Sequence, residues 1–131
     1  MLKKFKVLVA SLSVISFLFI GVSVFAYYAS STQSHDGKTI NVSLNATLNP
    51  ASATAKTTWS GITGHKVKTD ILSCDSYGAP FSTESSVTTY SNATASFTRQ
   101  DAQYEIVSEH FVIHNSTGAQ SIVKYYSTYW G

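Results

Sequence analysis

The clearest pattern along the chain is an alternation of apolar and polar residues over positions 39–48. Ile40, Val42 and every second residue after them as far as Leu48 are apolar, and the residues between them are Asn, Ser or Thr. A period of two predicts a β-strand with one buried face. Asn49-Pro50 should end this strand, because proline has no backbone N–H for a β-ladder and restricts the residue before it.

The C-terminal third carries the strongest strand signals. Residues 104–114 and 119–130 are rich in Val, Ile and Tyr, and they flank a short polar link at residues 115–118 that ends in Gly118. β-Branched and aromatic residues favour strands, and a short link containing glycine favours a β-hairpin. We therefore predict a C-terminal hairpin against which the rest of the domain packs.

Two weaker strand patterns lie upstream of this hairpin. Residues 51–60 alternate with small residues on one face, and this row ends in the large side chain of Trp59. A small inward face lets a second sheet approach closely. Residues 65–74 form a further strand pattern after the glycine-containing link at 61–64, and we expect these two strands to pair as a hairpin.

Residues 81–90 and 93–99 are rich in Ser and Thr and predict two more short strands, with a turn at Ser91-Asn92. The total is about seven short strands, and no amphipathic helical period appears after the N-terminal segment. This spacing predicts an all-β fold, a small antiparallel β-sandwich, forming a single domain over residues 39–131.

The N-terminal segment, residues 1–26, has the pattern of a secretory signal helix. Three lysines precede an uncharged apolar run at residues 7–20, and Val24-Phe25-Ala26 resembles a cleavage site. We expect cleavage after Ala26, with Ala29 as the second choice. The alternative is an uncleaved membrane anchor, because the apolar run approaches bilayer-spanning length. Residues 27–38 are small and polar, and we expect them to form a flexible leader.

Loss of the signal changes the charge of the protein. Three of the nine basic residues lie in the signal, so the remainder has six basic and seven acidic groups, a formal net charge of −1. No nucleic-acid partner is therefore predicted. Cys74 is the sole cysteine, so no internal disulfide can form. We expect Cys74 to be a buried apolar side chain, the alternative being a reactive or intermolecular thiol.

No cofactor or metal site is predicted. His110 and His114 would share one face of a helix, but four residues of a strand span about 13 Å, too far for one ion. No serine lies in a Gly-x-Ser-x-Gly turn, and the carboxylates are dispersed along the chain. The sequence does not predict an enzyme.

Aromatic residues near the C-terminus are the best candidates for a binding surface. In a strand, Tyr125 and Tyr129 share one face, whereas Tyr126 and Trp130 share the other. One pair should be buried and the other exposed. We expect Tyr126 and Trp130 to be exposed for binding, together with Tyr77 in the loop at residues 75–80, because exposed aromatic rings provide large contact areas. The alternative is that a neighbouring strand covers the second face.

These patterns favour a small exported protein, secreted or at the cell surface, that binds without catalysis. Its partner would be cell-wall carbohydrate or a surface protein, and contact with the membrane would occur only through an uncleaved signal. The lysine-rich start and the scarcity of cysteine favour bacterial export. A secreted bacteriocin-like antagonist is the alternative, an extracellular hydrolase is less favoured, and long strand edges also allow an oligomer.

Overall fold

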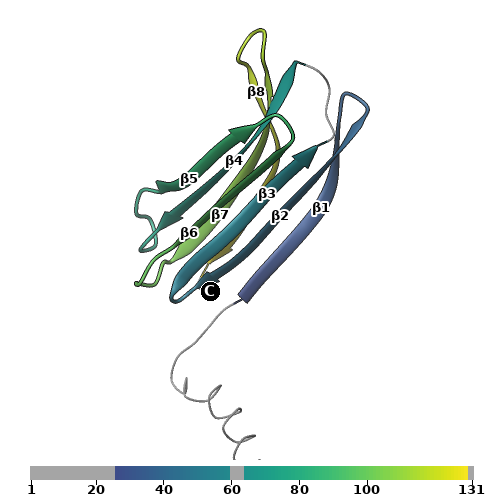
Figure 1. Ribbon diagram of the computed structural model, residues 1–131. Coiled ribbons are helices and arrows are strands. Elements are labelled where there is room, and N and C mark those ends of the chain that lie inside the picture. The colour runs from purple at the N-terminus through teal and green to yellow at the C-terminus, as the bar shows by residue number, and fades with distance from the viewer. Residues whose placement is uncertain (1–25, 60–63, 130–131) are drawn as a thin grey trace, which may run out of the picture.

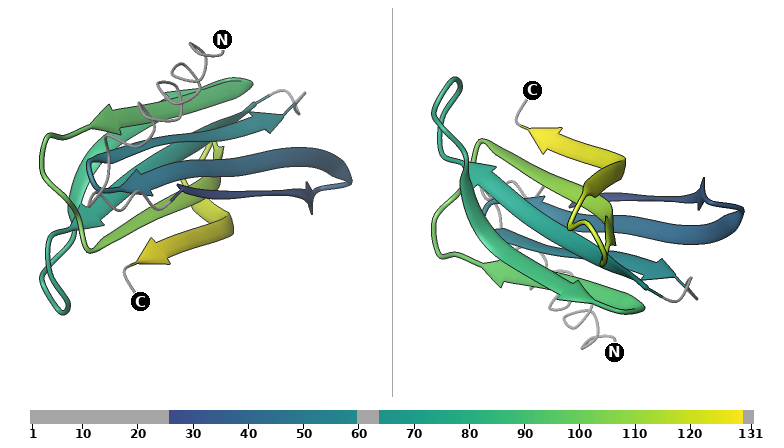
Figure 2. Two further views of the ribbon diagram at one scale, coloured as in Figure 1. Left: turned by 90° about the horizontal axis from the view of Figure 1, so that it is seen from below. Right: turned by 90° about the horizontal axis from the view of Figure 1, so that it is seen from above.

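Two four-stranded antiparallel sheets pack face to face in the computed structural model, which describes residues 26–59 and 64–129 (Figures 1 and 2). The strands are β1 (Ala26–His35), β2 (Lys38–Leu48), β3 (Ala51–Trp59), β4 (His65–Cys74), β5 (Ser82–Thr89), β6 (Asn92–Thr98), β7 (Glu105–His114) and β8 (Gln120–Tyr129). The first sheet has the order β1-β2-β3-β6 and the second β5-β4-β7-β8. The all-β prediction is confirmed, with eight strands in the described residues rather than about seven. The expected signal helix lies outside these residues.

The core lies between the two sheets and follows the predicted alternation. Every second residue of β2 from Ile40 to Leu48 is buried, and Asn49-Pro50 forms the turn into β3, as predicted. The inner face of β3 and β6 consists largely of alanine, and Ala55 pairs with Ala95, both fully buried. Such a small face lets the second sheet pack closely.

β1 corrects the expectation of a flexible leader at residues 27–38. The strand pairs along its whole length with β2, from Ala26 opposite Thr47 to His35 opposite Lys38. Asp36 and Gly37 connect the two strands with positive φ angles of 52° and 76°, the conformation of a two-residue type I′ hairpin turn. The pattern did not predict a strand here because several inward residues are polar, and two of them, Ser31 and Gln33, form hydrogen bonds within the protein.

The expected hairpin between residues 51–60 and 65–74 is also wrong. β3 pairs with β2 and β6 in the first sheet, whereas β4 pairs with β5 and β7 in the second. The chain therefore changes sheets three times, between β3 and β4, between β5 and β6, and between β6 and β7. A strand with one buried face satisfies the same pattern in either sheet, so alternation alone could not distinguish these arrangements.

The predicted C-terminal hairpin is confirmed. β7 and β8 pair antiparallel along their length, with an irregularity in register between His110 and Phe111. Gly118 donates its N–H to the carbonyl of His114 at 2.7 Å and closes the connection with a positive φ of 74°. β7 also pairs with the whole of β4, so the hairpin forms half of the second sheet.

In the described ranges, no helix has the length and apolar character needed to cross a membrane.

Candidate functional site

Four aromatic side chains gather at the end of the second sheet where β4 ends and β7 begins. They are Tyr77 and Phe81 in the loop after β4, Tyr104 just before β7, and Tyr129 at the end of β8. Tyr77 packs edge-on against Tyr104 at 5.9 Å between ring centroids, and Tyr104 stacks on Tyr129 at 6.3 Å with 21° between the planes. We call these four residues the aromatic cluster.

The backbone around β4 places these rings next to one another. Tyr104 donates its N–H to the carbonyl of Cys74 at 2.8 Å, which joins the start of β7 to the end of β4. The N–H of Ala79 bonds to the carbonyl of Ser76 at 3.0 Å, and this turn carries Tyr77 at its tip. The turn uses the positive φ of 82° at Gly78, a conformation that glycine adopts without steric cost.

The aromatic cluster is open to solvent on one side. Tyr77 is 86% exposed, Tyr129 58% and Phe81 42%, which is unusual for large apolar side chains that sit together. They line a hollow of about 350 Å³, at the lower end of the range for small-molecule sites. This end of the sheet therefore offers ring faces to a ligand without any rearrangement of the core.

Glu105 supplies a polar group in the same hollow. It pairs with Tyr129 across β7 and β8 and with Cys74 across β7 and β4. Its carboxylate accepts a hydrogen bond from the hydroxyl of Ser127, which fixes the orientation of the side chain. A carboxylate oxygen beside aromatic faces can accept hydrogen bonds from a hydroxyl-rich ligand.

Cys74 lines the hollow but is not poised as a nucleophile. The side chain is buried, as expected for a small apolar residue. Burial raises the pKa of its thiol, and the nearby carboxylates of Glu105 and Asp75 raise that pKa further. The thiol therefore stays protonated at neutral pH, and the thiolate is the reactive form.

The three predicted binding residues do not form one surface in the described part of the chain. Tyr77 is exposed and belongs to the aromatic cluster. Tyr126 was expected to be exposed, and this is wrong: it is 8% exposed and pairs with Ser108 on the inner face of the second sheet. Trp130 lies outside the described residues. The exposed pair of β8 is Tyr125 and Tyr129 instead.

The sequence patterns do not single out Phe81, Tyr104 or Glu105 as members of this site. Tyr129 was recognised only as a member of one strand face. The antiparallel pairing of β7 with both neighbours brings Tyr104 and Tyr129 together, and this pairing depends on strand order. The one usable signal is the predicted C-terminal hairpin, which brings residues 104 and 105 close to residues 128 and 129.

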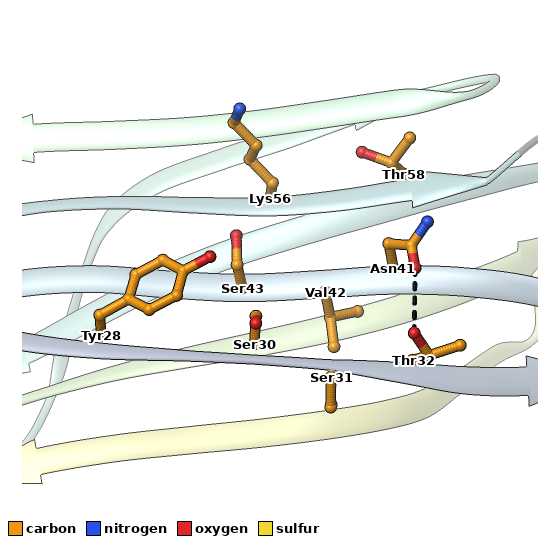
Figure 3. Close-up of a pocket in the computed structure, with 9 residues that line it drawn as sticks. All are labelled: Tyr28, Ser30, Ser31, Thr32, Asn41, Val42, Ser43, Lys56 and Thr58. Atoms are coloured by element: carbon orange, nitrogen blue, oxygen red, sulfur yellow. Dashed lines mark hydrogen bonds between the residues drawn. The ribbon is translucent and has the colours of Figure 1, made fainter.

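A second, more polar hollow crosses the outer face of the first sheet (Figure 3). It has a volume of about 270 Å³, and Tyr28, Lys56 and a set of hydroxyl and amide side chains from β1, β2 and β3 line it. Thr32 donates to the side-chain oxygen of Asn41 at 3.1 Å, so part of this polar surface is already paired. Tyr28 is the only aromatic among its lining residues.

His110 lies in a fully buried polar network that superficially resembles a catalytic relay. Its Nδ1 is 2.8 Å from the hydroxyl of Thr57, and its Nε2 is 2.9 Å from the hydroxyl of Ser108. Thr57 also bonds to Thr69 at 2.7 Å, and Thr69 donates to the carbonyl of Ala93. The one hydroxyl proton of Thr69 is used in this bond, so Thr57 must donate to Thr69. Thr57 therefore accepts from Nδ1–H of His110, which leaves Nε2 to accept from the hydroxyl of Ser108.

The geometry of this network indicates a role in stabilising the fold rather than in catalysis. Burial lowers the pKa of His110 to about 4, so the ring is neutral at pH 7 and a weak base. Ser108 and Thr57 are both fully buried, and a substrate cannot reach the hydroxyl of Ser108 without opening the sandwich. The group that orients Nδ1 is a hydroxyl, whereas a catalytic triad uses a carboxylate.

No protein-family model matches the sequence, and comparisons with curated proteins and with solved structures find no match.

Proposed function

We propose that this protein is an exported, non-catalytic binding module that attaches to cell-wall carbohydrate through the aromatic cluster. The observation that carries the proposal is the set of exposed rings of Tyr77, Phe81 and Tyr129 around one open hollow. Sugar rings have an apolar C–H face that packs on an aromatic ring and hydroxyls that hydrogen-bond at its edge. Glu105 and the tyrosine hydroxyls supply such polar groups.

The start of β1 is compatible with signal cleavage after Ala26. Cleavage after Ala26 removes only the first residue of β1 and keeps every pair from Tyr27 opposite Ala46 onwards. Cleavage after Ala29 would remove Tyr27 and Ala29, which pack against the core. The first cleavage position therefore agrees better with a stable exported domain than the second.

A binding role fits the described residues better than hydrolysis. The histidine with hydroxyl partners, His110, is inaccessible, and the accessible hollow contains Glu105 beside a protonated thiol. These groups can hold a ligand by packing and hydrogen bonds. They do not include an exposed nucleophile with an adjacent base.

The test is co-sedimentation of the purified protein with insoluble cell-wall material. We expect the wild type to pellet and a Tyr77→Ala/Tyr129→Ala variant to stay in solution, because both removed rings are exposed and neither supports the core. Tyr28→Ala is the matched control, since Tyr28 is 66% exposed but lies in the polar hollow of the other sheet. It should pellet like the wild type.

If neither the wild type nor any variant pellets, the proposal is wrong, and growth inhibition of neighbouring bacteria becomes the next assay. Inhibition at low concentration would indicate a secreted antagonist. If Tyr28→Ala abolishes pelleting and the double variant does not, the polar hollow of Figure 3 is the binding site instead.

A further inference from the structure

Three of the four histidines of the chain meet at the end of the sandwich opposite the aromatic cluster. His35 ends β1, while His65 begins β4 and pairs with His114 at the end of β7. The aromatic cluster lies at the other ends of β4 and β7, about 30 Å away at 3.3 Å per residue. The histidine cluster is thus separate from the proposed carbohydrate site.

The three imidazoles are in contact with one another. The ring centroids of His65 and His114 are 4.3 Å apart, and those of His35 and His114 are 5.7 Å apart. Asp36, in the turn after β1, points its Oδ2 at this group, 3.6 Å from Nε2 of His35 and 4.0 Å from Nε2 of His65. Both sheets therefore contribute to one cluster, through the ends of β1 and β7 and the start of β4.

Three ring nitrogens of this cluster lack hydrogen-bond partners among the described residues. Nε2 of His35 and both ring nitrogens of His65 are buried from solvent without a partner. A buried nitrogen without a partner destabilises a protein by about 1–3 kcal/mol, so such groups are rare and require an explanation. A bound ion would explain two of them at once, Nε2 of His35 and one ring nitrogen of His65.

We propose that His35, Asp36, His65 and His114 bind one divalent transition-metal ion, with zinc as the expected occupant, and that this ion joins the two sheets. Imidazole nitrogens and a carboxylate oxygen are ordinary zinc ligands at about 2.0–2.2 Å. Four protein ligands without an open position are typical of a structural zinc site rather than a catalytic one. In a chain with one cysteine, such an ion would replace the disulfide that many exported domains use.

Asp36 lies close to the ligand-to-ligand distance of a formed site from two of the histidines. Neighbouring ligand atoms around tetrahedral zinc are about 3.3 Å apart, given bonds of about 2.0 Å. The distances of 3.6 Å and 4.0 Å from Asp36 to His35 and His65 exceed this value by less than 1 Å. Within residues 26–59 and 64–129, no three such groups already surround a common point, so binding requires small rotations of the rings, His114 included.

The site also has a built-in reporter. Trp59 packs edge-on against His35 at 6.1 Å and against His65 at 5.9 Å between ring centroids. A copper(II) ion held by these histidines would quench the fluorescence of Trp59. A Trp130→Phe background leaves Trp59 as the sole tryptophan, so the signal reports on this cluster alone.

The decisive experiment is calorimetric titration of the purified, untagged protein with zinc chloride. We expect one ion per chain, and at a free zinc concentration of 100 times Kd we expect Tm to rise by about 10 °C. Asp36→Asn should weaken zinc binding at least tenfold. This variant keeps the fold, because asparagine tolerates the positive φ of 52° at this position. His65→Gln should abolish binding.

Asp75→Asn is the matched control, since Asp75 is an exposed aspartate at the other end of β4 and should leave zinc affinity unchanged. The proposal is overturned if the wild type shows neither binding nor a rise in Tm at millimolar zinc. It is equally overturned if Asp36→Asn, confirmed as folded by circular dichroism, binds zinc as tightly as the wild type. Loss of carbohydrate binding would not affect it, because the two sites are distinct.

Discussion

Thr57 of β3 and His110 of β7 are joined by a hydrogen bond of 2.8 Å that crosses from one sheet to the other. Both side chains are fully buried in a core that is otherwise mostly apolar. The bond belongs to a chain of polar groups in which each proton has an acceptor, ending at the carbonyl of Ala93. A different packing of the sheets would leave these groups unpaired, so the network favours the observed packing.

Replacing Thr57 by valine tests the network. The change keeps the shape of the side chain. It removes the acceptor for the Nδ1–H of His110 and the donor to the hydroxyl of Thr69. We expect the free energy of unfolding to fall by about 1–3 kcal/mol. Thr58→Val is the control, because Thr58 lies on the outer face of the same strand and should change stability by less than about 0.5 kcal/mol. Equal effects in urea denaturation would contradict the account.

Stability should also depend on pH through His110. Its pKa is lowered to about 4 by burial, whereas the ordinary histidine value is 6.5. As the pH falls, the unfolded chain therefore takes up this proton first. The contribution to stability is complete above pH 6.5 and is lost as the pH falls towards 4, a loss that approaches roughly 3 kcal/mol at 1.36 kcal/mol per pH unit.

The measurement is the difference in unfolding free energy between the wild type and His110→Gln at pH 7 and at pH 4. The difference cancels the titration of the other groups. We expect the advantage of the wild type to shrink at the lower pH. An advantage that stays constant between these pH values would show that His110 is not held neutral by its surroundings.

Tyr126 should act as a structural residue rather than a binding residue. Its hydroxyl is 2.7 Å from that of Ser31, which joins β8 to β1, and its ring packs edge-on against His110. We expect Tyr126→Phe to lower the free energy of unfolding by about 1 kcal/mol. Tyr125→Phe, at an exposed position, should have little effect, and neither variant should change pelleting with cell-wall material. Loss of pelleting in Tyr126→Phe would contradict the observed placement.

Strand positions were largely predictable because one face of most strands is apolar. Residues 65–74 were predicted as a strand with the observed bounds of β4, and the alternation in β2 appears unchanged in the core. β1 was missed because Ser31 and Gln33 occupy inward positions. Gln33 donates to Ser31 at 2.8 Å, and Ser31 is also paired with the hydroxyl of Tyr126. The Asp36-Gly37 pair is the sequence signal that indicates a two-residue hairpin turn between β1 and β2.

The site was less predictable because it depends on pairing between strands. Both faces of β8 carry aromatic residues, so composition did not show which face enters the core. The register with Ser108, an inner residue of β7, places Tyr126 inside and Tyr129 outside. The histidines were similarly dispersed: His110 and His114 were considered as one candidate pair, whereas His114 contacts His35 and His65 instead.

The most direct test of the proposed function is the affinity of single-ring variants for isolated cell-wall polysaccharide. The measurement is a depletion isotherm for the wild type, Tyr77→Ala and Tyr28→Ala. We predict that Tyr77→Ala raises the apparent Kd about tenfold, which corresponds to about 1.4 kcal/mol, while Tyr28→Ala leaves it unchanged. An affinity of Tyr77→Ala equal to that of the wild type would contradict a role for the aromatic cluster in binding.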